Sequence, residues 1–559
     1  MQRRFGGSSR RISIPPHALP CAGSIAVAAV LLLSADAGAG MRTRCMDAEP
    51  CPRAAYASTD SIGAGEPSKD GLDTLSVDWE KCRGLPVGRI HCSGNTRTRD
   101  RVILQEVLLE TSDPLDPELV AESERNLRKL EYLGSVRIIP TIDEQRGAVD
   151  LDVCVADRLP WIVFAIPSLG GGRFDLKYHL SNQNFLGSGI GLGATGSISN
   201  EEADQAMFYF TEPRIAASRW GGTFLIGQQG DLGMQYTVAF DRPLYQIASR
   251  WSLSAGAYDQ EREGRFYGPR VILSKYNRRI KGGSIGGTRR FGGGNRLLDL
   301  SLSLSYQESR HEFVEGSTAL VPVDKERGRL GLGISVEQFR YVEATHVNNL
   351  GPVEDFKLGP WGSLNLGITS EILGSDGDYP DIGLNAGVLE GSPSRGYITC
   401  SVVASARIED GDLTNIVNSA TAGFGVRTCP RGMIAFTAEG RLLRRMEDPS
   451  QLLLDSNNWL RGYKTYANEG TRRLAASLEL RHTVWMAKHW ALGLALFTDA
   501  GMVWHEDESV RKMPVLVGSG VGFRFGVPWF IGAPVFRLDI GYGFKDDNTD
   551  VNLGFGQRF

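Results

Sequence analysis

The sequence lacks the long hydrophobic segments of a helical membrane protein. After its first forty residues, no stretch reaches the roughly 20 consecutive apolar residues that a membrane-spanning helix needs. The composition, with 42% apolar and 23% charged residues, still allows a protein that crosses a membrane by β-strands. In a membrane β-barrel only every second side chain of a strand faces lipid. The sequence also lacks a large excess of one charge sign. Its net charge of −4 offers no electrostatic footprint for nucleic acid. These absences exclude a helical membrane protein and a nucleic acid partner.

Patterns typical of metal and redox sites are missing as well. None of the eight histidines stands in an H-E-x-x-H motif or another ligand spacing, and there is no C-x-x-C pair. We therefore expect no metal, no cofactor and no enzymatic activity. One thiol of the seven beyond Cys21 must stay unpaired, and Cys400 and Cys429 could pair across adjacent strands. These seven cysteines fit an oxidising compartment: Cys45, Cys51, Cys82, Cys92, Cys154, Cys400 and Cys429.

Two glycine-rich segments match enzyme motifs without the context that those motifs need. Residues 191–196 read G-x-G-x-x-G, and residues 282–286 read G-x-S-x-G. The first motif requires a following helix within a βαβ unit, and the second requires a strand-to-helix turn. Both segments have strand character, and with 68 glycines such matches arise by chance. We assign neither a catalytic role.

The N-terminus has the order of a secretory signal peptide. Four arginines come first, an apolar run from Ala22 to Leu33 follows, and small residues then resemble a cleavage site. We predict a signal peptide over residues 1–39. The Arg- and Ser-rich start leaves an organelle transit peptide as the alternative, although such a peptide does not need the apolar run. Residues 40–79 are rich in Gly, Ser, Asp, Pro and Ala without periodicity, which predicts a flexible segment.

Residues 87–157 change to a pattern of strand, helix, helix, strand and strand. Apolar residues at helical spacing predict the first helix over 98–110. Asp116 can cap the second helix and Pro117 can occupy its first turn, and we expect Gly134 to end it. The last two segments alternate apolar and polar residues, as strands do. The pattern predicts a single small α+β domain.

From residue 160 to residue 559 the sequence shows two-residue alternation broken by turn residues. Val551, Leu553, Phe555 and Phe559 share one face of the last strand, and polar residues or glycine share the other. Strands with their turns come to roughly 25 residues each, so about 16 strands fit. The pattern predicts a mainly β fold, with a transmembrane antiparallel β-barrel after the α+β domain. Five tryptophans near predicted strand ends suit aromatic girdles: Trp459, Trp485, Trp490, Trp504 and Trp529.

Near the C-terminus stands Leu460-Arg461-Gly462-Tyr463, a (Val/Leu)-Arg-Gly-(Phe/Tyr) tetrapeptide. Here the chain resembles the outer-membrane protein assembly factor superfamily, the BamA- and TamA-like proteins with POTRA domains and a bacterial surface antigen D15-type barrel. The resemblance implies that residues 87–157 form a POTRA domain and that the tetrapeptide lies on a loop folded into the barrel. It also implies a C-terminal strand signal at Phe555 and Phe559. Residues 182–187 look like the first barrel strand of the family. Further segments with family counterparts stand in the family's order along the chain: Gly94-Asn95 with Thr98, 240–245, 353–355, 477–481, 497–501 and 538–541.

Strand alternation places two carboxylates in the lumen independently of the resemblance. Bulky apolar residues at even positions turn Asp499 inward, and the same rule turns Glu479 inward on the preceding strand. An arginine carried inward by a loop can bind both, because its planar guanidinium has five donors in a fixed fork. The resemblance implies the same pairing of Arg461 with Glu479 and Asp499. The alternative is that these residues are ordinary lumen charges, as in a porin.

Two functions agree with the resemblance. An assembly factor or insertase would bind extended client polypeptides at an unsatisfied strand edge by β-augmentation, surrounded by outer-membrane lipids. The alternative is a two-partner-type secretion pore, although such pores usually have two POTRA domains and an N-terminal plugging helix. A surface hydrolase would need a full α/β domain, for which there is no room.

The expected location follows from the same resemblance. We expect the bacterial outer membrane, with the POTRA domain in the periplasm, where it could also bind a partner protein. An organelle outer membrane is the alternative. Many members of the family have several POTRA domains and this chain has one, so the resemblance leaves the client open.

Overall fold

The computed structural model shows a mainly β chain with a small α+β domain followed by a large antiparallel sheet, which confirms the expected fold class. Among the described residues, no helix has the length and apolar character to cross a membrane. The predicted signal peptide lies outside these residues, as does the predicted flexible segment apart from Trp79. The structure describes residues 79–170, 173–199, 203–269, 271–392, 394–487, 489–528 and 535–557.

The α+β domain is a three-stranded sheet in the order β1-β3-β2, with β1 parallel and β2 antiparallel to β3. Its core joins the sheet to the helices through fully buried side chains such as Ile103, Leu127 and Val153. Trp79 packs against this core, so the ordered domain starts before Val87. The elements are α2 (Trp79–Cys82), β1 (Val87–Ser93), α3 (Asp100–Leu104), α4 (Pro117–Arg128), β2 (Leu133–Asp143) and β3 (Ala148–Asp157).

The helices α3 and α4 begin close to the predicted positions and end before the predicted ones. The Asp116 carboxylate accepts a hydrogen bond from the Glu118 backbone N–H at 3.0 Å, and Pro117 starts α4, which confirms the predicted cap. The prediction that Gly134 ends this helix is wrong, because α4 ends at Arg128 and Gly134 lies in β2. The predicted first helix is also too long: α3 ends at Leu104, and short turns follow it.

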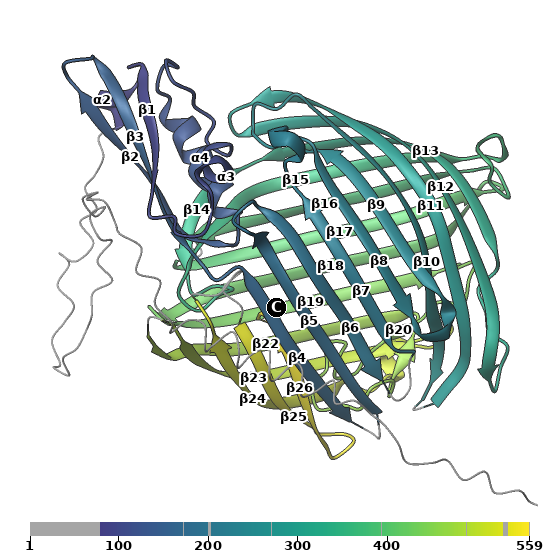
Figure 1. The fold of residues 1–559 in the computed structure, drawn as a ribbon. Coiled ribbons are helices and arrows are strands. Elements are labelled where there is room, and N and C mark those ends of the chain that lie inside the picture. Colours follow the sequence, from purple (N-terminus) through teal and green to yellow (C-terminus); the bar gives the residue numbers. More distant parts are fainter. Residues whose placement is uncertain are drawn as a thin grey trace, which may run out of the picture. The chain divides into compact units, whose positions relative to one another are not determined.

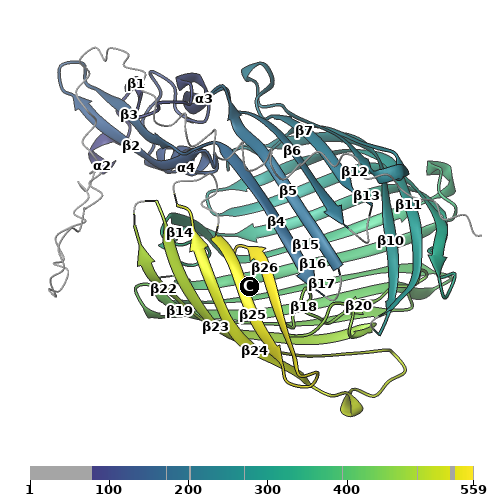
Figure 2. The ribbon, with the colours of Figure 1, turned by 60° about the horizontal axis from the view of Figure 1, so that its bottom comes forward.

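The large sheet has the strand order of a closed barrel, in which β26 lies beside β4 (Figures 1 and 2). Successive strands are antiparallel, and β14 continues β13 across an irregularity at Phe339, opposite Gly359. Counted in this way, the described residues contribute 20 strands to the order. This exceeds the expected number of about 16, because strand and turn together take fewer than the roughly 25 residues assumed from longer outer loops.

The bounds of the strands show how unequal they are. The first group is β4 (Trp161–Gly170), β5 (Arg173–Phe185), β6 (Ile190–Ser199), β7 (Gln205–Glu212), β8 (Gly221–Gln229), β9 (Met234–Arg242), β10 (Trp251–Gly268), β11 (Val271–Gly293), β12 (Arg296–Gly316) and β13 (Lys325–Gln338). The second group is β14 (Arg340–Thr345), β15 (Val353–Thr369), β16 (Tyr379–Ser392), β17 (Gly396–Glu409), β18 (Asp412–Cys429), β19 (Gly432–Arg444), β22 (Arg472–Met486), β23 (Ala491–Trp504), β24 (Leu516–Gly526), β25 (Val535–Gly543) and β26 (Asn548–Phe555).

Alternation along each strand separates a lipid face from a lumen face. On β12, Leu302 and Leu304 are exposed on the outer face, whereas Ser301 and Ser303 face inward. Leu302 is 57% exposed, which for a large apolar side chain indicates an apolar surrounding rather than water. After Tyr306 the outer face changes to charged residues, which marks the end of the apolar band.

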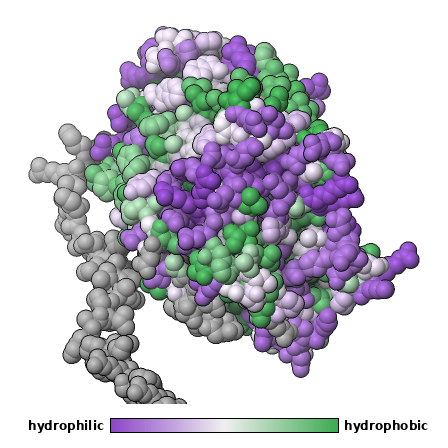
Figure 3. Space-filling model, turned by 90° about the vertical axis from the view of Figure 1, so that its right-hand side faces the viewer, coloured by the Kyte–Doolittle hydropathy of each residue, from purple (hydrophilic) through white to green (hydrophobic). Residues whose placement is uncertain are grey.

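Strands β10, β11 and β12 are far longer than their neighbours, with 18, 23 and 21 residues against 8 to 9 in β7, β8 and β9. At about 3.4 Å per residue, β11 exceeds what an apolar band about 25 Å tall requires. Its projecting part carries outward ion pairs, Arg279 with Asp259 at 2.7 Å and Lys281 with Glu308 at 2.7 Å. Much of the face shown in Figure 3 is accordingly hydrophilic. These three strands therefore continue beyond the membrane.

Two expectations about single segments are wrong. Residues 182–187 are not the first barrel strand, because β4 precedes them and they form the end of β5 and its turn to β6. Cys400 and Cys429 do not pair, because the strand register places Cys400 opposite Ala422 and Cys429 opposite Gly432. Spacing along the sequence cannot reveal such a register, which only the fold sets.

The expected aromatic girdle is present in part. Trp485 and Trp490 are exposed on either side of the turn between β22 and β23, as girdle residues are. Trp504 is buried, and Trp459 lies in a loop against an apolar cluster, so both are wrongly assigned to a girdle. Trp529 lies outside the described residues.

The α+β domain contacts turns at one end of the barrel strands. The Asn184 side chain, at the end of β5, donates to the Thr98 hydroxyl at 2.7 Å. Arg214, between β7 and β8, binds Glu106 with two hydrogen bonds of 2.7 and 2.6 Å. Glu106 lies just after the end of α3, so its ion pair joins the α+β domain to a barrel turn 108 residues further along the chain. The strand ends away from these turns form the opposite rim.

Candidate functional site

The candidate site is built on residues 445–471, the connection between β19 and β22, which we call the lumen loop. Two short strands within it pair with each other, β20 (Leu452–Leu453) and β21 (Glu469–Gly470). Asp455, fully buried, accepts hydrogen bonds from the backbone N–H groups of Asn457, Asn458 and Tyr466 at 2.9 to 3.0 Å. One buried carboxylate thus fixes the turn that presents the next residues to the barrel wall.

Arg461 extends from this turn into a ring of acceptors on the barrel wall. Its Nε and Nη2 bind the two oxygens of Asp499, each at 2.7 Å. Its Nη1 donates to Glu479 at 2.6 Å and to Asp539 at 3.0 Å. The guanidinium carbon also lies 3.4 Å from the centre of the Phe497 ring, a geometry in which the ring face attracts a cation. Arg461 therefore holds strands β22, β23 and β25 together from inside.

Ser477 completes the acceptor ring on β22. Its hydroxyl accepts from Arg461 Nη2 at 3.1 Å and donates to Asp499 at 2.6 Å. The backbone N–H of Arg461 also donates to Asp499, at 3.1 Å. The Asp499 carboxylate, which is fully buried, thus receives four hydrogen bonds from the loop and its neighbour, and charge-assisted bonds of this kind are the strong ones.

Three further arginines surround the same carboxylates. Arg481 binds the second oxygen of Glu479 at 2.7 Å. Arg524 binds Asp539 at 2.6 Å, and Arg537 lies 3.2 Å from the same carboxylate. Together with Arg461, Glu479, Asp499 and Asp539 they form the Arg461 cluster, with four positive and three negative groups. Each carboxylate faces at least one guanidinium, so the cluster joins the lumen loop to the barrel wall through paired charges.

Glycine allows the loop to approach the wall this closely. Gly462 has φ +93°, and a Cβ there would lie 2.5 Å from the backbone nitrogen of Gly543. A Cβ at Gly541 or Gly518 would in turn meet Arg461 at 3.0 and 2.2 Å. Side chains at these positions would therefore push the loop from the wall.

Apolar residues flank Arg461 on both sides in the chain. Leu460 and Tyr463 are fully buried and pack with Leu454, Ala475 and Leu516. The Tyr463 hydroxyl donates to the backbone carbonyl of Val517 at 2.9 Å. The tetrapeptide thus combines an ionic anchor, a glycine contact and apolar packing.

The lumen loop also reaches the last strand. Asn548 of β26 donates to the Gly462 carbonyl at 3.1 Å, and Asn552 donates to the Ser456 carbonyl at 3.4 Å. Ser456 and Asp550 form a further hydrogen bond. The loop therefore contacts β26 as well as β22 to β25, which are the strands on one side of the position where β26 meets β4 (Figure 2).

The structure brings together most of the residues singled out in the sequence. Leu460, Arg461, Gly462 and Tyr463 lie at the wall, and Glu479 and Asp499 both contact Arg461. Phe555 ends β26, and Phe559 lies outside the described residues. The two enzyme-like motifs, residues 191–196 and 282–286, lie inside β6 and β11.

Sequence reasoning missed the third carboxylate and two of the arginines. Asp539 stands on the polar face of its strand, as do Arg524 and Arg537 on theirs, and this alternation was a usable signal that they point inward. Asp455 carried no such signal, because its role depends on the loop conformation.

Comparison with known families matches both parts of the chain. Residues 85–157 match the POTRA family, described as a surface antigen variable number repeat. Residues 382–559, which include the Arg461 cluster, match the Omp85 superfamily domain. The outer membrane protein assembly factor BamA of Neorickettsia risticii is 35% identical over 72 residues, which cover 13% of this chain and 10% of that relative.

Several solved barrels have similar structures at low sequence identity. BamA from Haemophilus ducreyi lacking POTRA domains 1–3 is 13% identical, with a TM-score of 0.38 over 85% of this chain and 84% of that chain. CdiB from Escherichia coli is 13% identical, with a TM-score of 0.47 over 85% of this chain and 76% of that chain.

Proposed function

We propose, from the premise that this chain belongs to the Omp85 superfamily, that it is an outer-membrane assembly factor that inserts β-barrel or other client polypeptides into the membrane. The observation that carries this proposal is the lumen loop, which binds β22 to β26 from inside through the Arg461 cluster and the asparagines of β26. One side of the β26–β4 seam is thereby braced. The role is not enzymatic, because the work consists of presenting backbone edges.

The seam supplies the chemistry of insertion. A strand edge offers unpaired N–H and C=O groups, and an extended client can pair with them as an added strand. In the hydrocarbon core every such group must be paired, so a client strand at an open edge gains hydrogen bonds that lipid cannot provide. With β26 held by the loop, opening at the seam moves β4, which follows directly from the POTRA domain.

The POTRA domain is proposed to lie in the periplasm and to collect clients there. Its sheet order leaves β1 and β2 as edge strands, and an edge strand can bind an extended peptide by the same β-augmentation. It could bind a periplasmic partner protein in this way too. The exposed leucines of the barrel contact outer-membrane lipids. An organelle outer membrane remains the alternative location.

Insertion can be tested with the purified full-length protein in liposomes. An unfolded barrel client is added, and its insertion is measured by heat-modifiable migration on gels and by protection from protease. We expect insertion with the wild type and a strong reduction with Arg461→Ala. Arg296→Gln, an exposed arginine at the far end of β12, is the matched control and should insert clients normally.

The same assay distinguishes an insertase from the alternative function, a polypeptide secretion pore. A client recovered inside the vesicles, and not in their membrane, would identify a polypeptide secretion pore and contradict the insertase. Equal insertion by wild type, Arg461→Ala and empty liposomes would contradict both.

A further inference from the structure

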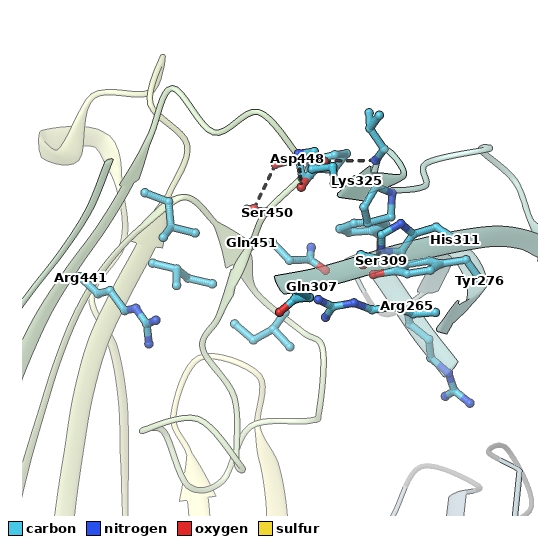
Figure 4. A pocket seen from close by; sticks show the side chains of 18 of the residues that line it. Arg265, Tyr276, Gln307, Ser309, His311, Lys325, Arg441, Asp448, Ser450 and Gln451 are labelled. Atoms are coloured by element: carbon cyan, nitrogen blue, oxygen red, sulfur yellow. Dashed lines mark hydrogen bonds and ion pairs between the residues drawn. The ribbon is translucent and has the colours of Figure 1, made fainter. Parts of the chain in front are cut away.

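A second feature of the lumen has no part in the Arg461 cluster. Around the lumen loop, between the wall of β10 to β13 and the wall of β19 and β22, lies a cavity of about 600 Å³ (Figure 4), within the size range of ligand sites in proteins. Arg441 on β19 lies on the other side of the loop from Arg265 and Lys325 (Figure 4). The cavity is thus bounded by two walls of the barrel and by the loop between them.

The lining of this cavity is strongly cationic. Among the described residues that line it, Asp448 is the only carboxylate, and Lys325 already binds it at 2.8 Å. Six basic side chains line it as well: Arg265, Arg278, Lys325, Arg327, Arg441 and Arg473. This imbalance differs from the Arg461 cluster, where carboxylates and guanidiniums nearly match.

Three of these arginines are not held in place by an ion pair. In the described part of the chain, Arg278, Arg327 and Arg441 form no ion pair, although all three face the lumen. Arg278 stands opposite His311 and Arg327 opposite Gln307 in the strand register, and both partners line the cavity. With one carboxylate in the lining for six basic side chains, the basic side chains repel one another, and an anionic ligand would relieve this repulsion.

The position of the cavity decides between lipid and polypeptide. Its residues on β12 come after Tyr306, at the level where the outer face of that strand has become charged. The arginines point into the lumen, so the barrel wall separates them from lipid headgroups. The lining also includes apolar side chains, among them Phe266 and Leu443. A chain that carries both carboxylates and apolar groups fits such a lining better than a simple inorganic anion does.

We infer that this cavity binds an acidic segment of a client polypeptide in the lumen, with Arg278, Arg327 and Arg441 binding its carboxylates. The inference rests on the proposed function for the identity of the ligand as a polypeptide. It adds a ligand class and a place of binding that insertion at the seam does not require.

The test measures peptide binding by the purified full-length protein in detergent micelles. The probe is a fluorescent hexapeptide of alternating Asp and Leu, and its matched control has Asn in place of Asp. We expect fluorescence anisotropy to show binding of the acidic peptide only, weakened by added salt. Arg278→Gln, Arg327→Gln and Arg441→Gln should each weaken binding about fivefold, as expected for partly exposed charges, and the triple variant should weaken it further.

Controls separate binding from folding and from the proposed function. Arg296→Gln should bind as the wild type does, and every variant should keep heat-modifiable migration, since the three arginines are not part of an ion pair. Equal binding of the Asn peptide, unchanged binding by the triple variant, or displacement by an equal concentration of inorganic phosphate would each overturn the inference. Client insertion without peptide binding would overturn this inference alone, whereas peptide binding without insertion would overturn the proposed function alone.

Discussion

Arg461 leaves water for five side-chain hydrogen bonds to four residues of the barrel wall. Arg461→Ala would leave Glu479 and Asp499 buried without this partner, and breaking a buried pair costs about 3–5 kcal/mol. We expect the lumen loop to detach and become cleavable by protease, while Arg461→Lys, which keeps the charge without the fork, restores only part of the protection.

A double-mutant cycle tests whether this loss belongs to the pair. Arg461→Ala, Asp499→Ala and their combination are compared by the denaturant needed to expose the loop to protease. Coupled residues lose most of their interaction at the first substitution, so the double variant should be little worse than Arg461→Ala. Additive losses would mean that Arg461 and Asp499 act independently.

Gly462 allows a sharp test of the close approach between loop and wall. Gly462→Ala should weaken the loop through two effects, the positive φ of +93° and a Cβ placed 2.5 Å from Gly543 N. Gly411→Ala is the matched control, because Gly411 has φ +84° with nothing within 4 Å of the added Cβ. Both variants carry the backbone strain of about 1–2 kcal/mol, so equal stability of the two proteins would show that the contact with Gly543 does not matter.

Asp157 gives the POTRA domain a predictable dependence on pH. Burial raises the pKa of its carboxyl, but hydrogen bonds from the Thr98 hydroxyl and from the backbone N–H groups of Thr96 and Arg97 outweigh this and lower the pKa below its usual range. The folded state thus favours the charged form. The resulting stabilisation is complete above the unfolded pKa of about 3.9 and is lost as pH falls through the lower, folded value.

Hydrogen exchange of β3 and α3 checks this dependence. The wild type should lose protection as pH falls below about 4, after correction for the intrinsic exchange rate. Asp157→Asn should be less protected at neutral pH and lose the acid-dependent step. An unchanged step in the variant would assign it to another group.

At the scale of elements, the sequence predicted strands and the lumen partners of Arg461 wherever apolar and polar residues alternate regularly. Glu479 and Asp499 could be placed in the lumen because bulky apolar residues alternate with them. Asp539 lies on an equally regular strand, but its contact with Arg461 depends on the register across β22 to β25, which no local pattern records. The strand β4 was missed because 162–166 reads as a continuous apolar run. The first helix was predicted too long because Glu106 keeps helical spacing in the sequence, whereas in the fold it lies after α3 and binds Arg214.

The last strand is expected to be necessary for the barrel. Strand β26 pairs with β25 over eight residues and binds the lumen loop through Asn548 and Asn552. Deleting residues 548–559 would expose the edge of β25 in lipid, where unpaired backbone groups are costly. We expect the truncated protein to be degraded. Normal amounts of heat-modifiable protein in the membrane would contradict this expectation.

At the scale of the whole molecule, the strand order implies a body that resists detergent until heated. Each strand of the barrel order, from β4 to β26, pairs with the next strand of that order, and such pairing is hard to break where water is absent. The full-length protein should fractionate with the outer membrane and migrate faster on gels before boiling than after. Recovery in the soluble fraction would contradict the proposed location.

The unequal strand lengths make the opposite rim of the barrel, away from the POTRA domain, uneven in height. On one side, the strands β10 to β12 have 18 to 23 residues each. The strands β25 and β26, next to the seam, have only 9 and 8 residues. We therefore expect antibodies added to whole cells to reach β10 to β12 more readily than β25 and β26.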